Sequence, residues 1–221
     1  MTQHASVSID DLFAPSAPAT RAATGLVTSA NADIAVVSLP GDKQGYLSVA
    51  DWYPGRQLPA VNSYVTAMVA EDGFKVRLTV LDDLLPQALI EGLVPEMQDG
   101  RVRVMGVARE AGRRTKIAVA STVDGLDPVT ATIGRRANRV KEVSRQMRGE
   151  QIDVIAWAST KKAYVANSLA PVGVERVERT ETGFAAMVAR HQVSAAVGAS
   201  GLNARLASML VGADVVVRPA D

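Results

Sequence analysis

Two glycine loops carry the residues of this chain that are best suited to binding a polyanion. The first loop and the start of the segment after it contain Gly134, Arg135, Arg136, Ala137, Asn138 and Arg139. The second, 64 residues later, contains Gly198, Ala199, Ser200 and Gly201, followed by Asn203 and Arg205. Glycine lets a phosphate approach the backbone closely, a following helix favours its negative charge, and arginines add ion pairs. We therefore expect both loops to contact a nucleic-acid backbone.

Positive charge is concentrated around the first loop. Residues 1–100 hold 5 basic and 12 acidic residues, a net charge of −7, whereas residues 101–148 hold 12 and 4, a net charge of +8. Residues 149–221 are balanced, with 7 of each. This asymmetry favours a polyanionic partner, while a basic face that only solvates the fold gives the same pattern. Two groups of basic residues flank the loop: Arg113, Arg114 and Lys116 before it, and Lys141, Arg145 and Arg148 after it.

Composition excludes several other kinds of site. The 221 residues include no cysteine and only two histidines, which excludes disulfides, thiolate sites and histidine-cluster metal sites, and we expect no cofactor. The chain has no P-loop lysine motif, and its carboxylate pairs at 10–11 and 82–83 lie in a tail and a connector, so we expect no enzyme. The absence of a long apolar run and of a signal-peptide pattern predicts a cytoplasmic protein with no membrane partner.

The elements that must position the two loops repeat along the chain. In the first unit we expect a helical connector from residue 84, strands at 101–109, 115–120 and 151–157, and a helix on each side of Gly134, the first capped by Asp127. In the second we expect helices at 161–169, 192–197 and 203–211 and strands at 172–177, 183–189 and 213–217. A repeat of this form is typical of tandem KH modules, in which a glycine loop clamps a nucleic-acid backbone.

Short strands precede the repeat. Five runs at 25–29, 34–39, 46–49, 63–69 and 74–80, separated by Pro-Gly and Asp-Gly turns, predict a small barrel of the OB type. Five rings in this region could stack on bases: Tyr46, Trp52, Tyr53, Tyr64 and Phe74. The region is acidic, which favours a structural or auxiliary role. Residues 1–23 are expected to form a disordered tail with a few isolated hydrophobic residues; the alternative is that Ser8–Phe13 docks into a groove on a partner.

Five stretches resemble the NusA family of bacterial transcription factors: Leu93–Gly100, Ala108–Val119, Asp127–Val129, Gly149–Ile155 and Leu202–Ser208. The resemblance covers about residues 24–217 and implies an α+β, multidomain fold. Together with the tail expected at 1–23, it implies a small OB-fold β-barrel at 24–83 and two tandem type II KH domains at 84–158 and 159–221. It also implies an RNA-binding regulator of transcription elongation, pausing, termination or antitermination. The implied partners are nascent single-stranded RNA, held on a barrel–KH–KH surface, and RNA polymerase or other elongation factors.

The sequence departs from the family pattern at three points. We expect the family's N-terminal polymerase-binding domain to be absent, Ala137 stands in place of a glycine, and Ala199 stands in place of a basic residue. If position 137 needs a positive φ, the Cβ of alanine costs about 1 kcal/mol. These changes leave open an alternative, a degenerate protein-interaction module that recruits a partner without specific RNA binding. On the RNA-binding reading, the first loop supplies electrostatic capture and the second a closer backbone fit.

Overall fold

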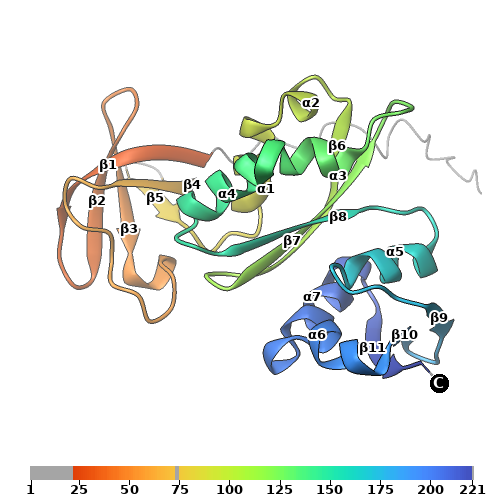
Figure 1. Ribbon diagram of the computed structural model, residues 1–221. Helices are drawn as coiled ribbons and strands as arrows, with labels where there is room; N and C mark the ends of the chain where they lie inside the picture. The colour runs from red at the N-terminus through yellow and green to blue at the C-terminus, as the bar shows by residue number, and fades with distance from the viewer. Residues whose placement is uncertain (1–21, 73–74, 221) are drawn as a thin grey trace, which may run out of the picture.

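A closed β-barrel forms the N-terminal part of the computed structural model, which describes residues 22–72 and 75–220 (Figure 1). Its strands are β1 (Ala22–Ala30), β2 (Ile34–Leu39), β3 (Lys43–Ser48), β4 (Tyr64–Asp72) and β5 (Lys75–Thr79), with a short 3-10 helix, η2 (Val49–Asp51), after β3. The barrel order is β1-β2-β3-β5-β4, with β4 antiparallel to β1 and β3 parallel to β5. Val27, Val37 and Leu47 are fully buried, because alternate side chains of a strand point inward.

The first KH module follows the barrel. Its elements are α1 (Leu85–Leu93), α2 (Pro95–Gln98), β6 (Val102–Glu110), β7 (Arg114–Ser121), α3 (Pro128–Ile133), η3 (Arg135–Ala137), α4 (Asn138–Gln146) and β8 (Gln151–Ala156). The sheet order is β6-β7-β8, with β6 antiparallel and β8 parallel to the central strand β7. The parallel pair is possible because α3 and α4 connect β7 to β8.

The second KH module repeats this order. Its elements are α5 (Lys161–Ser168), β9 (Arg176–Arg179), β10 (Gly183–Val188), η4 (Arg190–Gln192), α6 (Val193–Val197), η5 (Ala199–Gly201), α7 (Leu202–Val211) and β11 (Asp214–Pro219). The sheet order is β11-β10-β9, again with one parallel and one antiparallel pair. The α+β multidomain fold, with a barrel before two KH modules, is confirmed.

The strand predicted at 172–177 is present but begins four residues later. The segment 172–175 forms a turn and irregular chain after α5, and β9 begins only at Arg176. In the turn, Val172 N–H donates to Leu169 O at 3.2 Å, and the Val172 side chain is buried because it packs with Val188 and Ala196. The apolar pattern of the segment therefore came from a packed turn. The predicted docking segment Ser8–Phe13 and Phe74 lie outside the described residues. Of the predicted tail at 1–23 only Ala22 and Ala23 are described, and they begin β1.

The three units are joined through buried apolar side chains. Trp52 and Tyr53 of the barrel belong to the same core cluster as Val143 and Met147 at α4. At the other junction α7 packs on β6 and β7. Figure 1 shows the first KH module between the barrel and the second KH module. Because cores are shared at both junctions, the glycine loops before α4 and α7 are held in a single assembly.

Candidate nucleic-acid interface

The first glycine loop joins α3 to α4. Asp127 caps α3, as the sequence predicts, because its Oδ1 accepts a hydrogen bond from Val129 N at 3.0 Å. A hydrogen bond from the Thr130 hydroxyl also lowers the pKa of the Asp127 carboxyl below its ordinary value. The helix ends at Gly134, whose N–H bonds Thr130 O at 3.0 Å, and α4 begins at Asn138. The Asp127 carboxylate thus anchors the start of the helix that leads into the loop.

The two glycine loops have the same backbone conformation. Gly134 has φ 74° and ψ 173°, and Gly198 has φ 76° and ψ 168°. The third residue of each loop is left-handed, with φ 54° at Arg136 and 53° at Ser200. The fourth residue is also left-handed, with φ 59° at Ala137 and 74° at Gly201. Position 137 therefore does need a positive φ, and the alanine there carries a strain of about 1 kcal/mol.

The opening glycine of each loop lies against the residues that follow the loop. A Cβ added to Gly134 would lie 2.5 Å from Asn138 Oδ1 and 2.8 Å from Arg139 Cγ. One added to Gly198 would lie 2.8 Å from Asn203 Cβ and 2.9 Å from Asn203 N. Both positions thus require glycine for space as well as for φ. Gly201 has nothing within 4 Å of an added Cβ, so this position is restricted by φ alone.

The first loop presents two exposed guanidinium groups. Arg135 and Arg136 are exposed, and within residues 22–72 and 75–220 neither makes an ion pair. They precede the first turn of α4, where the free N–H groups of a helix favour an anion. Asn138 is exposed at the start of that turn. This cluster can therefore bind a phosphate with little desolvation and without breaking an existing salt bridge.

Arg139 has a different role from its neighbours. Its Nη1 donates a hydrogen bond to Glu96 Oε2 of α2 at 3.0 Å and another to Ala131 O of α3. The side chain is largely buried. Arg139 therefore ties α4 to α2 and α3, and it positions the loop more than it offers charge to a ligand.

The β6–β7 turn lies beside the second loop, not the first. Arg205 of α7 donates to Ser200 O at 3.2 Å and also pairs with Glu110 at the end of β6. Glu110 pairs in turn with Arg113, and the guanidiniums of Arg205 and Arg113 lower the pKa of the Glu110 carboxyl. Arg113 and Arg205 remain about half exposed. The first KH module thus brings a basic side chain next to the uncharged second loop, where Ala199 and Ser200 are exposed.

This arrangement of paired loops has counterparts among known proteins. Residues 82–157 match the family model of the NusA-like first KH domain, and residues 161–220 match that of the NusA-like second KH domain. The chain is a NusA-like protein. The family is one of RNA-binding transcription factors, and the order of the two matched domains is that of the two KH modules described above.

Three relatives named "Transcription termination/antitermination protein NusA" illustrate the match. The protein of Halalkalibacterium halodurans is 33% identical over 195 residues, which is 86% of this chain and 51% of the relative. That of Thermus thermophilus is 32% identical over 179 residues, 80% of this chain and 45% of the relative. That of Bacillus subtilis is 40% identical over 130 residues, 58% of this chain and 35% of the relative. The NusA-like chain spans about half the length of the first of these relatives.

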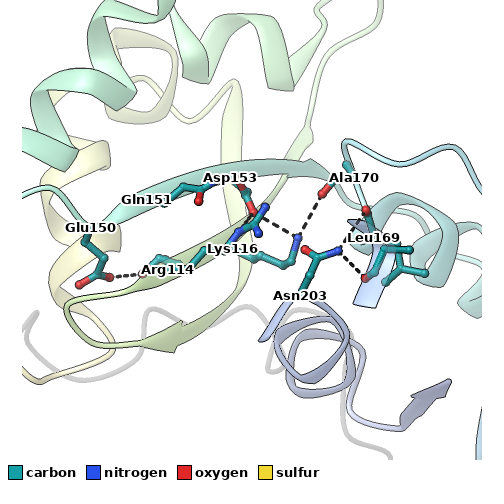
Figure 2. Close-up of polar contacts among 10 residues, drawn as sticks. Arg114, Lys116, Glu150, Gln151, Asp153, Leu169, Ala170 and Asn203 are labelled. Atoms are coloured by element: carbon teal, nitrogen blue, oxygen red, sulfur yellow. Dashed lines mark hydrogen bonds and ion pairs between the residues drawn. The ribbon is translucent and has the colours of Figure 1, made fainter. Parts of the chain in front are cut away.

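Three of the predicted contacts lie in a polar junction between the KH modules (Figure 2). Lys116 has no exposed side-chain surface, and its Nζ lies 3.2 Å from Asp153 Oδ2 and 3.3 Å from Ala170 O. Arg114 Nε donates to the same Asp153 oxygen at 2.6 Å. Asn203 is buried and donates to Ala196 O at 2.8 Å. Burial lowers the pKa of the Lys116 ammonium. Lys116 and Asn203 therefore cannot touch RNA in this NusA-like structure, and the prediction for them is wrong.

The physical reason is that β7 is covered on both faces. It is the central strand of its sheet, and α3 packs on one face while α7 of the second KH module packs on the other. Because successive side chains of a strand point to opposite faces, a sheet covered on one side leaves every second side chain exposed to solvent. Here, however, Thr115, Lys116 and Ile117 are all fully buried. The residues of α7 that contact β7 lie nearly ninety positions later in the sequence, so no local pattern predicts this contact.

The barrel aromatics separate into buried and exposed rings. Trp52 and Tyr53 are buried at the junction with the first KH module, Tyr46 is half-buried, and Tyr64 is exposed. Sequence reasoning recognised the basic edge of α4 but missed that its end meets Tyr64.

Across the described ranges, no helix is long and apolar enough to cross a membrane, and no three His, Cys, Asp or Glu residues are grouped to hold a metal ion.

Proposed function

We propose that this NusA-like chain holds nascent single-stranded RNA along the barrel–KH–KH surface and so regulates transcription elongation, pausing, termination or antitermination. The observation that carries the proposal is the first glycine loop, where exposed Arg135 and Arg136 are free of carboxylate partners in the described part of the chain. KH loops of this form clamp the backbone of about four nucleotides. The proposed site of action is the cytoplasm, with RNA polymerase or another elongation factor as the protein partner and with no catalytic role.

The second loop has an accessory role in this proposal. Its backbone matches that of the first loop, but its charge comes from Arg205 and from Arg113, both of which share Glu110. We expect it to bind a phosphate more weakly, because the carboxylate of Glu110 offsets one positive charge. The first loop then captures the strand and the second extends the bound length.

The test is RNA binding by a variant that removes the charge without straining the loop. Arg135→Gln with Arg136→Asn suits the backbone, because asparagine tolerates the left-handed conformation at position 136. Fluorescence anisotropy with a labelled oligoadenylate of about 12 nucleotides measures affinity over a series of salt concentrations. Loss of two phosphate contacts should reduce the slope of log K against log salt by about 1.4. Arg179→Ala on β9 is the control, since Arg179 is exposed and has no ion pair within the described ranges.

The second candidate is recruitment of a protein partner without RNA binding, and the uncharged second loop favours it. Affinity capture of transcription complexes assembled with purified RNA polymerase separates the two functions. RNA binding by the wild type that the loop variant loses supports the clamp. Retention of polymerase without any salt-dependent RNA binding supports recruitment instead.

A further inference from the structure

The junction between the barrel and the first KH module contains a pocket that is separate from both glycine loops. Its volume is about 350 Å³. Strands β1 and β4 form one wall, and the end of α4 forms the other. The lining residues are Thr24, Tyr64, Thr66, Arg145, Gln146 and Arg148. This side of the barrel is distinct from the β2–β3 face with which barrels of this class usually bind single strands.

Tyr64 offers this pocket an exposed aromatic ring. The side chain is 70% exposed at the first position of β4, whereas the neighbouring rings of Trp52 and Tyr53 are buried. Bases of single-stranded nucleic acid stack on such rings, because every base has an aromatic face. A base in a duplex is already stacked and cannot do so without unpairing, so the ring favours a single strand.

Two guanidinium groups at this junction, that of the pocket residue Arg148 and that of Arg56 beside it, make no ion pair within residues 22–72 and 75–220. Arg148 lies over the Trp52 ring at 5.7 Å and donates to Tyr64 O at 3.4 Å. Arg56 lies over the Tyr53 ring at 5.6 Å and donates to Arg148 O at 2.7 Å. Both side chains are exposed. Each guanidinium has five N–H donors, so most of its donors remain available for phosphate oxygens.

Arg145 adds a third positive charge that is already shared. Its guanidinium pairs with Glu142 at 2.6 Å, and Glu142 also accepts a hydrogen bond from Gln146 at 2.9 Å. On the other wall, Thr66 donates to Gln146 Oε1 at 3.2 Å and lies 2.8 Å from the Thr24 hydroxyl. The pocket thus combines one ring, polar walls and an excess of positive over negative side chains.

α4 connects this pocket to the first glycine loop. The helix has nine residues, so it spans about 14 Å at 1.5 Å per residue. Asn138, Lys141 and Arg145 are exposed and spaced by three and four, which places them along one face of the helix. A strand held at the loop can follow this basic face to the barrel.

We propose that the pocket is a third RNA contact, in which Tyr64 stacks on one base and Arg148, with Arg145, binds the adjoining phosphates. This inference rests on the proposed RNA-binding function, and its site is separate from the two glycine loops. It requires a strand longer than the nucleotides held by the first loop. RNA of about four nucleotides fills the clamp alone and does not reach the pocket.

Two labelled oligoadenylates, of about 4 and about 12 nucleotides, test the proposal on the full chain. Tyr64→Ala should weaken binding of the longer RNA about tenfold, while Tyr64→Phe, which keeps the ring, should bind like the wild type. Neither variant should alter binding of the shorter RNA. Ultraviolet crosslinking of the longer RNA followed by mass spectrometry should find the adduct on Tyr64. Binding of the longer RNA by Tyr64→Ala within about twofold of the wild type overturns the proposal.

Arg148→Gly tests the phosphate contact without straining the fold. Arg148 has φ 58°, a conformation that glycine adopts more easily, so this variant removes the guanidinium and relieves the backbone. The slope of log K against log salt for the longer RNA should fall by about 0.7, and Arg179→Ala should leave it unchanged. Normal binding that depends on Arg135 and Arg136 but not on Tyr64 or Arg148 overturns the third contact alone. Failure of the wild type to bind either RNA overturns the proposed function and the third contact together.

Discussion

The two glycine loops share a backbone and differ in how their charge is supplied. At the first loop, Arg135 and Arg136 belong to the loop itself. At the second, the loop residues are uncharged; Arg205 of α7 donates to Ser200 O, and Arg113 of the other KH module is linked to Arg205 through Glu110. Loop conformation and loop charge are therefore separable. The conformation follows from the opening glycine and the left-handed residues, whereas the charge depends on which basic side chains lie nearby.

This difference makes the junction between the modules part of the RNA-binding surface. The second loop has Arg113 beside it only while β6 and α7 remain packed together. Lys116, Asp153 and the carbonyl of Ala170 lie across that packing (Figure 2). A change that loosens the junction should weaken the second loop and leave the first loop intact.

The largest expected effect is that of Asp153→Asn. The substitution keeps the size of the side chain but leaves the buried Lys116 ammonium without a carboxylate partner. Breaking a buried pair in this way should lower the free energy of unfolding by about 3 kcal/mol. Urea denaturation measures the loss. The control is Asp124→Asn, since Asp124 is exposed before α3, and it should change the stability by less than about 0.5 kcal/mol.

The stability loss in Asp153→Asn should depend on pH. Burial already lowers the pKa of Lys116 below its ordinary value of 10.5, and removal of Asp153 lowers that pKa further. Between the folded-state pKa of Lys116 in the variant and that in the wild type, only the variant binds fewer protons when folded than when unfolded, so its stability relative to the wild type rises with pH across that interval, which lies below 10.5. A stability loss that does not change across the alkaline range contradicts the burial of a charged Lys116.

Glycine-to-alanine changes at the opening position should affect the two loops unequally. An alanine at 198 would meet the backbone N of Asn203 at 2.9 Å, whereas the atoms nearest to an alanine at 134 belong to the side chains of Asn138 and Arg139. Side chains can move aside more cheaply than the backbone of a helix. Gly198→Ala should therefore cost about 2–3 kcal/mol and Gly134→Ala about 1–2 kcal/mol, part of each being the positive φ. Equal losses in thermal or urea unfolding contradict this reading of the loops.

Much of the fold could be predicted from the sequence because its signals are local. The alternation of β1 to β5, the Asp127 cap and the helices at each glycine are properties of short segments, and the structure has all of them. The segment 172–175 differs from the predicted strand because a packed turn buries Val172 as a strand would.

The candidate site was harder to predict because its chemistry depends on contacts between distant segments. Strand β7, which carries Lys116, packs against α7, Arg113 is linked through Glu110 to Arg205 of the other module, and Arg148 after α4 donates to Tyr64 O of the barrel. Each of these pairs joins residues far apart in the sequence. Composition and spacing indicate which side chains are basic, but only the packing of the modules determines which of them face solvent.

A reciprocal pair of substitutions isolates the backbone contribution at the fourth loop position. Ala137→Gly should stabilise the chain by about 1 kcal/mol, and Gly201→Ala should destabilise it by about the same amount, because both positions have positive φ. Gly201→Ala introduces no clash, since nothing lies within 4 Å of the added Cβ. Calorimetric unfolding of both variants gives the two values. Changes of the same sign in both variants contradict the assignment to φ.

The smallest expected effect is that of Glu110→Gln, which tests whether Arg113 of the first KH module supplies positive charge to the second loop. The substitution keeps the hydrogen-bonding shape of the side chain but frees Arg113 and Arg205 from their shared carboxylate. The oligoadenylate of about 12 nucleotides should then bind about twofold more tightly, as expected when one exposed carboxylate no longer competes with a phosphate for the two guanidiniums. The gain should disappear at high salt and in a chain that also carries Arg113→Gln. Glu181→Gln, at the β9–β10 turn, removes the same charge from another exposed site and should leave affinity unchanged. If both variants bind equally more tightly, the gain reflects net charge, and the second loop draws no specific charge from the first module.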